Sequence, residues 1–472
     1  MKYISTRGKE VCQGFSDILL EGLVADGGLI IPESLPKIGI QKLEEWRELS
    51  YEDLAFEILS IFSNEISSND LRSLITKTYH SEAFNFGKEI VTLKPLFNNL
   101  SLLGLSQGPT LAFKDIAMQF LGNAFEYVLI NKNLKLNIIG ATSGDTGSAA
   151  EYALRNKKNI SVFMLSPYGR MSLFQRSQMY SLKDQNIHNI AVYGNFDELQ
   201  DIVKFLSSNL KFKQTYRLGL INSINWIRIA AQIVYYFYGW LRATNSNDTN
   251  KKVSFTVPSG NFGNILAGHI ARCMGLPIHR LVLATNENNV LEEFFKTGIY
   301  RPRKPALTYI TSSPSMDISH ASNLERFIFQ LVEQDPEQVK KLWLDLAENG
   351  FFDLSHFQPL FEKEYGFVSG SSTHQDRIET IKWIYKTLEI FIDPHTADGV
   401  KVATKFSEPG IPMLVLETAS PVKFSETVKE ALGKTPPIPS YLKNIEQLPQ
   451  KFTIMNCNAK EIREYFEVHA IT

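Results

Sequence analysis

From about Asn133 onward, short apolar runs rich in β-branched residues alternate with loops and with segments of helical periodicity. Each run carries apolar residues on both faces, which is typical of a strand covered by helices on either side of its sheet. Repeated strand and helix units of this kind build parallel sheets, so we predict an α/β protein. The predicted strands are LKLNIIG, ISVFML, NIAVYG, VSFTV, RLVLAT and MLVLE.

The rest of the chain departs from this alternation. The N-terminal part instead contains helix-period stretches at Tyr51–Phe62 and Ser68–Tyr79, while Pro-rich segments at Arg301–Ser315 and Thr435–Ser440 are predicted loops. A chain of 472 residues is long enough for several domains. We expect an N-terminal domain (1–95), a smaller α/β domain (96–240), a larger α/β domain (241–430) and a C-terminal appendage (431–472).

The overall charge is nearly balanced, with 49 Lys and Arg against 50 Asp and Glu. The chain therefore lacks the basic excess that binding to a nucleic-acid backbone requires. The most apolar long stretch, Ile224–Leu241, contains Asn225, Arg228 and Gln232 and falls short of the roughly 20 apolar residues of a membrane span. We expect a buried helix there, no nucleic-acid partner and no membrane segment.

Cysteines and histidines offer neither a disulfide framework nor a metal site. Cys12, Cys273 and Cys457 lie far apart and form no CxxC pair, and the nine histidines include no HExxH. We therefore expect no metal. Charges are scattered through MKYISTRGKEVCQGF, where a secretory signal would need an apolar core. A reducing compartment is favoured, and we predict a cytoplasmic protein.

Two loops share one architecture. In ATSGDTG (141–147) and PSGNFGN (258–264), a predicted buried strand runs into Gly, Ser, Thr and Asn residues that open directly onto a helix. Glycine lets successive N–H groups converge and the helix N-terminus adds partial positive charge, so each loop is a candidate anion site. Either loop alone fits an ordinary helix cap equally well. Together they favour a site that holds two anionic groups.

Lys114 occupies an unusual position, among apolar residues at the predicted start of a helix with apolar residues at 116, 120, 124 and 128. The helix dipole and the apolar neighbours both disfavour a charged amine, and a neutral amine can form a Schiff base. The alternative is a lysine that reaches water or pairs with Asp115. Pyridoxal phosphate combines an aldehyde for a lysine with a phosphate for a Gly-rich loop, so we infer it as the cofactor.

Thr418 follows the predicted strand MLVLE, at the kind of sheet edge where open α/β proteins bind ligands. The alternative is a threonine that caps a turn, which is the more common role for such a residue.

Further motifs run in order along nearly the whole chain. They are MKYISTRG at Met1, GLVADGGLIIPESLP at Gly22, GPTLAFKD at Gly108, ATSGDTGSAA at Ala141, SPYGRMSLFQRSQM at Ser166, NSINWIRI at Asn222, VPSGNFGN at Val257, SPSMDISHASNLER at Ser313, DPHTADGV at Asp393 and ETASPVKF at Glu417. The sequence resembles the threonine synthase family, pyridoxal-phosphate enzymes of the tryptophan-synthase β-like fold (fold type II), in the branch with a long N-terminal domain. Three residues depart from its pattern: Ser420 replaces a usual His, Asp398 an apolar residue and Ile227 an Ala.

The resemblance implies roles for individual residues. It makes Lys114 the catalytic lysine that binds the cofactor covalently, and it places Thr418 at the pyridine nitrogen. The phosphate cradle then comprises Gly260, Asn261, Phe262, Gly263 and Asn264. The loop Ser143–Gly147, through Ser143, Gly144 and Thr146, binds the substrate carboxylate. Candidates for holding the substrate phosphate are Asn225 and Arg228, together with Arg170 and Ser172, although Arg228 fits a structural cation equally well.

The resemblance also implies a reaction, the conversion of O-phospho-L-homoserine and water to L-threonine and phosphate. The alternative within the same fold is a pyridoxal-phosphate-dependent phospholyase or dehydratase that yields 2-oxobutyrate. A third possibility is a relative that has lost catalysis and serves as a binding protein, which the intact Lys114 and both loops disfavour. We expect a monomer or a homodimer.

Overall fold

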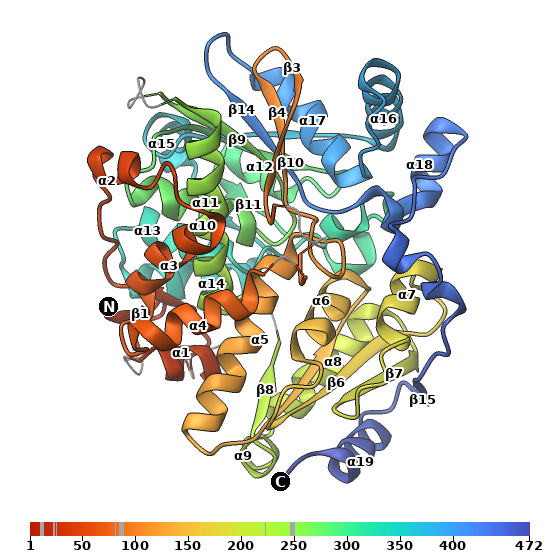
Figure 1. Cartoon of the computed structure of the whole chain (residues 1–472). Coiled ribbons are helices and arrows are strands. Elements are labelled where there is room, and N and C mark those ends of the chain that lie inside the picture. The colour runs from red at the N-terminus through yellow and green to blue at the C-terminus, as the bar shows by residue number, and fades with distance from the viewer. Residues whose placement is uncertain are drawn as a thin grey trace.

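The computed structural model describes residues 1–9, 14–21, 24, 26–80, 82–84, 89–221, 223–245 and 251–472. Cys12 and the first residues of two quoted motifs, Gly22 and Asn222, lie outside this described part. Two parallel sheets with helices around them organise the molecule (Figure 1). The predicted α/β class is therefore confirmed.

The larger sheet has six strands and lies in the upper half of Figure 1. Its neighbours are parallel except for the antiparallel pair β3 and β4 at one edge. All residues of its central strands β9 and β14 are buried, as expected for strands covered on both faces. In spatial order the strands are β13 (Phe367–Ser371), β10 (Ile278–Thr285), β9 (Val253–Pro258), β14 (Met413–Glu417), β4 (Leu100–Gly104) and β3 (Thr92–Phe97).

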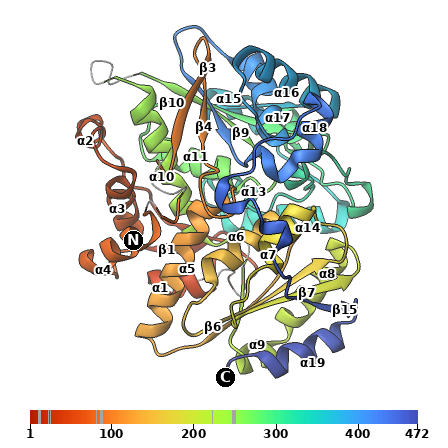
Figure 2. The same cartoon turned by 45° about the vertical axis from the view of Figure 1, so that its right-hand side comes forward.

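The smaller sheet is entirely parallel and has five strands. In spatial order these are β15 (Thr453–Asn456), β7 (Ile187–Tyr193), β6 (Ile160–Pro167), β5 (Leu136–Ala141) and β8 (Leu218–Leu220). All six strands predicted from the sequence occur in one or other sheet. The C-terminal segment descends along the molecule from α18 (Ser425–Leu432) and adds β15 beside β7 (Figure 2).

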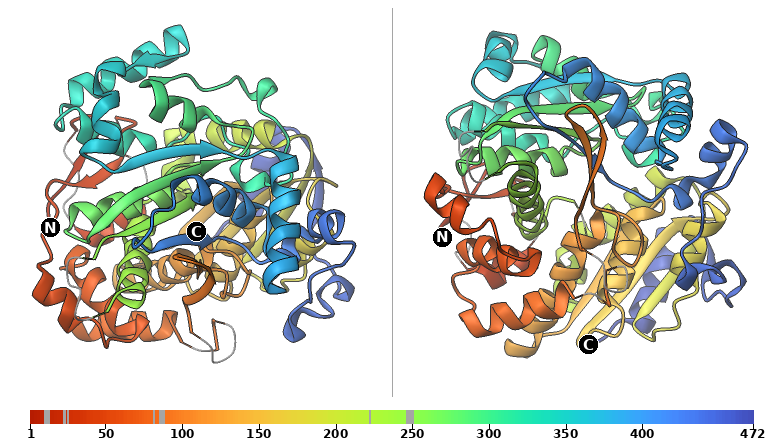
Figure 3. Two further views of the ribbon diagram at one scale, coloured as in Figure 1. Left: turned by 90° about the horizontal axis from the view of Figure 1, so that it is seen from above. Right: turned by 45° about the horizontal axis from the view of Figure 1, so that its top comes forward.

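The N-terminal segment forms a layer of its own beside α10 (Trp226–Ala243), as Figure 3 shows from two further directions. Rings of Tyr3 and Phe62 meet Trp226 at the start of α10, and Tyr51 meets Tyr238 near its end. The predicted helix at 51–62 is confirmed with the same bounds. The elements of the N-terminal segment are β1 (Tyr3–Ser5), α1 (Phe15–Glu21), β2 (Ile30–Pro32), α2 (Ile40–Glu45), α3 (Tyr51–Phe62) and α4 (Ser68–Thr78).

Three further helices begin near the carboxyl ends of strands β14, β5 and β9, respectively: α5 (Lys114–Asn131), α6 (Asp145–Leu154) and α11 (Gly263–Cys273). Residues 226–241 of α10 are all buried, which confirms the expected buried helix. Within the described ranges, no helix is both long and apolar enough to cross a membrane. The remaining elements are α7 (Leu173–Tyr180), α8 (Phe196–Ser208), α9 (Leu210–Thr215), α12 (Val290–Thr297), β11 (Ile299–Tyr300), α13 (Leu324–Leu331), α14 (Pro336–Asn349), β12 (Phe352–Asp353), α15 (Gln358–Lys363), α16 (His374–Leu388), α17 (Pro394–Phe406) and α19 (Ala459–His469).

The two sheets do not follow simple divisions of the sequence. Strand β4 falls within the expected unit 96–240 but pairs with β14 of the larger sheet. Strand β15 belongs to the expected appendage 431–472 but completes the edge of the smaller sheet. The chain therefore crosses between the sheets several times, and the carboxyl ends of strands from both sheets are brought together near Lys114.

Candidate active site

Lys114 is the first residue of α5 and lies beside the end of strand β14. The N–H of Phe113 donates to the carbonyl oxygen of Thr418 at 2.9 Å, and the N–H of Ser420 donates to the carbonyl oxygen of Leu111 at 3.0 Å. These two bonds hold the segment before α5 against the segment after β14. The structure thereby brings together Lys114 and Thr418, two residues that are far apart in the sequence.

The environment of Lys114 makes its neutral amine more frequent than that of a lysine in water. The pKa of this lysine is lowered to about 8, chiefly by burial and also by the charges of Lys423 and Arg228, against the opposing effect of Asp145. This confirms the direction that its apolar neighbours predict. Asp115, the alternative partner, instead accepts hydrogen bonds from the N–H and the hydroxyl of Thr110 at 2.9 and 2.7 Å. Asp115 thus stabilises the turn that precedes α5.

The loop between β5 and α6 is held open by one threonine. The hydroxyl of Thr142 accepts the N–H groups of Gly144 and Gly147 at 3.0 and 2.9 Å. Gly144 has a φ of 143°, a conformation that side chains rarely allow, and α6 starts at the next residue. Ser143 is exposed and Thr146 partly exposed. Ser143 and Thr146 are therefore accessible at a helix N-terminus, a position that favours an anion.

Asp145, within this loop, is the centre of a buried polar cluster. Its carboxylate lies 2.8 Å from Nζ of Lys423 and accepts from Ser315 Oγ at 2.9 Å and Gln175 Nε2 at 3.0 Å. Burial alone would raise its pKa, but the charges of Lys423 and Lys114 outweigh burial and hold it well below its usual range. Lys423 also donates to the carbonyl oxygen of Thr110 at 2.7 Å. The loop at 141–147 is thus tied to the turn before Lys114.

The second loop has the geometry of a phosphate cradle. Phe262 adopts a left-handed conformation with φ of 62°, and α11 begins at Gly263, so the first N–H groups of the helix have no partner within it. A Cβ on Gly260 would lie 3.0 to 3.1 Å from Ile318 and Met316, so a side chain here would be tightly crowded. Nδ2 of Asn264 is buried, and no described atom accepts a hydrogen bond from it. An anionic group with several acceptor oxygens, such as a cofactor phosphate, suits these donors.

Asn225 and Arg228 lie in the first turn of α10 and its cap. Asn225 caps the helix by accepting the N–H of Ile227 at 3.0 Å, and its Nδ2 donates to the carbonyl oxygen of Leu19 at 3.0 Å. Arg228 is buried, which lowers its pKa to about 10, and its charge acts on Lys114. Three cations, Lys114, Lys423 and Arg228, therefore gather around one region, which favours anionic ligands there.

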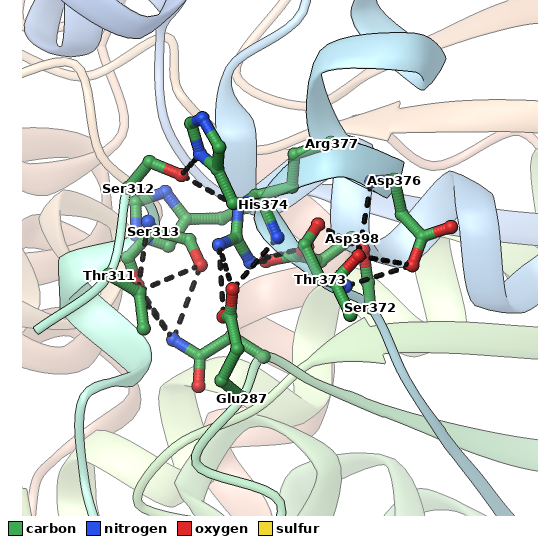
Figure 4. Close-up of polar contacts among 12 residues, drawn as sticks. Glu287, Thr311, Ser312, Ser313, Ser372, Thr373, His374, Asp376, Arg377 and Asp398 are labelled. Atoms are coloured by element: carbon green, nitrogen blue, oxygen red, sulfur yellow. Dashed lines mark hydrogen bonds and ion pairs between the residues drawn. The ribbon is translucent and has the colours of Figure 1, made fainter. Parts of the chain in front are cut away.

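Two of the three departures have structural explanations. Asp398 lies 3.1 Å from Arg377, which also bonds Glu287 at 2.7 Å, so a fully buried guanidinium accommodates this carboxylate (Figure 4). Arg377 also donates to Ser312 at 2.8 Å, on the segment that carries Ser315 toward Asp145. At position 420 the contact with Leu111 uses only the main-chain N–H, so a serine satisfies it. Nothing in the structure explains Ile227.

Sequence reasoning missed Lys423 as a residue of the site. Its signal was weak: a lysine between Val422 and Phe424, shortly after the end of a buried strand. In the structure it is buried in the 3-10 turn Pro421–Phe424. A buried ammonium group needs a charged or polar partner, and the sequence around Lys423 does not show that this partner is Asp145.

Two family models match the chain. One, described as "Threonine synthase N terminus", matches residues 2–79, and the other, "Threonine synthase, C-terminal", matches residues 396–466. The threonine synthase of Methylobacillus glycogenes is 54% identical, covering 99% of this chain and 100% of that protein. The threonine synthase of Corynebacterium glutamicum is 50% identical, with 98% of each covered.

Solved structures agree with these sequence relationships. The pyridoxal-phosphate-bound threonine synthase from Brucella melitensis superimposes with a TM-score of 0.94 at 39% identity, covering the whole of both chains. The similarity thus extends over both sheets, the N-terminal layer and the C-terminal segment.

Proposed function

Since this chain belongs to the threonine synthase family, we propose that it converts O-phospho-L-homoserine and water to L-threonine and phosphate. The observation that carries the proposal is the position of Lys114. Its amine, with a pKa lowered to about 8, lies between the end of β14 and the loop that opens onto the N-terminus of α6. The family relationship and this local chemistry point to the same reaction.

Pyridoxal phosphate fits the residues present. We propose that Lys114 holds it covalently, that residues 260–264 bind its phosphate and that the hydroxyl of Thr418 faces its pyridine nitrogen. Support comes from the crowded turn at Gly260 and from the buried free donor of Asn264. When bound, the cofactor supplies a conjugated ring that accepts the electron pair released at Cα and acidifies the neighbouring Cβ.

The substrate carboxylate is assigned to the loop Ser143–Gly147. Its backbone is preformed because Thr142 fixes two of its N–H groups and Asp145 is immobilised by three partners. Ser143 and Thr146 are then positioned to donate hydrogen bonds to an anion at the N-terminus of α6, while Gly144, whose N–H is held by Thr142, supplies the turn that leads into the helix. A preformed site lowers the entropy that ordering the substrate would cost.

The departing phosphate is assigned to the N-terminal end of α10. Arg228 supplies a buried positive charge there, and Asn225, whose side chain caps the helix, belongs to the same turn. In the proposed reaction the Cγ–O bond to phosphate breaks, the hydroxyl of water bonds to Cβ while its other proton passes to the phosphate released, and Cγ gains the proton that Cβ loses. Positive charge near the breaking bond stabilises the phosphate as it leaves.

Lys114 moves the protons at Cα. At pH 7 a lysine with a pKa of about 8 is neutral in about one molecule in ten, far more often than a lysine in water. We propose that this amine removes the Cα proton and later returns it. The charge of Asp145 raises the pKa of this amine and that of Lys423 lowers it, so the pair sets how readily the amine gives up its proton.

Compartment and assembly are also proposed. Cys273 and Cys457 are free thiols, as is usual in a reducing compartment, and we place the enzyme in the cytoplasm. Cell fractionation tests the location. We propose a monomer or a homodimer, which light scattering after size-exclusion chromatography distinguishes from larger assemblies.

The direct test supplies purified protein with pyridoxal phosphate and O-phospho-L-homoserine and quantifies threonine, phosphate and 2-oxobutyrate. Threonine and phosphate in equal amounts are expected, and Lys114→Ala should form neither. Phosphate with 2-oxobutyrate in place of threonine would contradict the proposal and identify the phospholyase or dehydratase alternative. Growth of a threonine auxotroph that lacks its own synthase, with the parent chain but not with the Lys114→Ala variant, provides the matching test in cells.

A further inference from the structure

Two adjacent tyrosines of α10 reach the phosphate cradle on α11. The hydroxyl of Tyr235 donates to Oδ1 of Asn264 at 2.6 Å, and the hydroxyl of Tyr236 lies 3.0 Å from the same oxygen and 2.9 Å from the main-chain oxygen of Asn264. All three side chains are buried. We propose that Tyr235 and Tyr236 are positioning residues that aim the Nδ2 amide of Asn264 at the cofactor phosphate.

The argument begins with the planar amide of Asn264. Its oxygen faces two hydroxyl donors, so the nitrogen on the other arm of the amide points away from the tyrosines. Nδ2 is buried, and the described residues provide no acceptor for it. A buried donor without an acceptor costs about 1–3 kcal/mol, so such a group indicates a partner that the polypeptide does not supply. A phosphate, which offers only acceptor oxygens when ionised, matches it.

The contact with Tyr235 also favours this orientation of the amide over the opposite one. If Asn264 were rotated by half a turn, its NH₂ would face the hydroxyls and its oxygen would face the phosphate. The distance of 2.6 Å between the Tyr235 hydroxyl and Oδ1 of Asn264 is typical of an O–H···O bond and shorter than N–H···O bonds usually are. Because a hydroxyl can also accept, it is this short contact that places the oxygen toward Tyr235 and the NH₂ on the other side.

Helix α10 carries Arg228, which is proposed to bind the substrate phosphate, as well as the two tyrosines that contact Asn264. Arg228, Gln232 and Tyr235 are spaced four and three residues apart and so share one face of the helix. Gln232 Nε2 donates to the carbonyl oxygen of Arg228 at 2.8 Å, and its Oε1 lies 3.2 Å from the Tyr235 hydroxyl. One face of one helix thus carries the cation assigned to the substrate phosphate and the tyrosine that positions Asn264 for the cofactor phosphate.

The inference rests on the proposed function, because it needs pyridoxal phosphate in the cradle. The experiment measures the dissociation constant of pyridoxal phosphate by absorbance titration and the ³¹P NMR shift of the bound phosphate. The variants are Tyr235→Phe, Tyr236→Phe and Asn264→Ala. We expect each tyrosine variant to weaken cofactor binding about 3- to 20-fold, the loss of roughly one hydrogen bond, and to move the ³¹P signal.

Tyr51→Phe is the matched control. Tyr51 is a buried tyrosine that packs against the ring of Tyr79, and its hydroxyl has no hydrogen-bond partner among the described residues. Its substitution should change neither the dissociation constant nor the ³¹P shift.

A double-mutant cycle separates positioning from packing. In the Asn264→Ala background, Tyr235→Phe should have no further effect on cofactor affinity, because the group that it positions is gone. Asn264→Asp provides a second variant that keeps an acceptor for both tyrosines but loses the NH₂, and it should bind the cofactor more weakly than Asn264→Ala. Parental affinity and an unchanged ³¹P shift in both tyrosine variants, or losses that add in the double variant, would overturn the inference. Failure of the parent chain to bind pyridoxal phosphate would instead overturn the proposed function.

Discussion

Nζ of Lys423 lies 2.8 Å from Oδ1 of Asp145, and both side chains are buried. This ion pair joins the turn that follows strand β14 to the first residue of helix α6. Lys423 further contacts the carbonyl oxygen of Thr110, four residues before Lys114. A single lysine thereby connects the loop at 141–147, the turn after β14 and the turn that precedes Lys114. The candidate site therefore depends on contacts between residues that lie far apart in the sequence.

Lys423→Met should raise the pKa of Lys114, because the charge of Lys423 lowers it in the parent. The apoenzyme takes up pyridoxal phosphate through the neutral amine, so the rate of uptake rises with pH. The pH at which this rate is half of its maximum should be higher in the variant than in the parent. KM for the substrate should also rise, since Asp145 loses its ion pair and no longer fixes its loop. Lys434→Met, at an exposed position, is the control. A parental midpoint in Lys423→Met would contradict the electrostatic role.

Lys114→Ala should abolish turnover but retain cofactor. Covalent attachment and phosphate binding are separate interactions, and the cradle at 260–264 is unchanged by the substitution. The parent should show the yellow absorbance of lysine-bound cofactor, and borohydride should fix the label to one peptide that contains Lys114. Label on a different lysine would show that the catalytic amine is misassigned.

The strands that sequence could predict are those with long, two-faced apolar runs, such as β6 at 160–167, whose residues are all buried. Five strands of the two sheets were not predicted: β3, β4, β8, β13 and β15. β8 has only three residues, and β15 alternates partly buried with exposed positions at the edge of a sheet. Their pairing depends on partners far away in the sequence, which a local pattern does not contain.

The same division applies to the site. Lys114 and the two Gly-rich loops were predictable because the relevant chemistry lies within a few consecutive residues. Lys423 and the tyrosine pair were not, since an ordinary helix or turn sequence surrounds them and their roles come from contacts with distant residues. The rings of Tyr235 and Tyr236 also fit the pattern of a buried helix, so the sequence gives no sign that their hydroxyls bond to Asn264.

Gly260→Val should weaken binding of pyridoxal phosphate at least tenfold, since a β-branched side chain would collide with Met316 and Ile318 and displace the cradle. Gly39→Ala is the matched control, because a Cβ at Gly39 would meet no atom within 4 Å. Absorbance titration measures the dissociation constant of pyridoxal phosphate for both variants. Equal affinities for the two variants would place the cofactor phosphate elsewhere.

Arg377→Leu should destabilise the fold by about 3–5 kcal/mol, because it leaves Asp398 buried without its cation. Asp398→Leu should cost less, since Arg377 keeps Glu287 as a partner. Burial raises the pKa of Asp398 to about 7 even in the parent, and loss of the guanidinium raises it further.

The folded Arg377→Leu variant therefore binds a proton more tightly than the unfolded chain does, and its stability should fall as the pH rises from 5 to 8. Urea unfolding at both pH values measures this dependence. A loss of stability that is equal at pH 5 and pH 8 would show that the charge of Asp398 is not its cause.

Thr418→Asp tests which group faces the cofactor nitrogen. Thr418 is buried, and its main-chain oxygen accepts the N–H of Phe113, so its side chain starts from a fixed position beside Lys114. A neutral hydroxyl does not keep a pyridine nitrogen protonated, whereas a carboxylate stabilises the protonated ring and makes it a stronger electron sink. The aspartate variant should therefore shift the absorbance bands of the bound cofactor and change the ratio of threonine to 2-oxobutyrate. Thr418→Ser keeps the hydroxyl and should retain most of the activity. A parental spectrum and product ratio in Thr418→Asp would place this residue outside the site, as a threonine that only ends a strand.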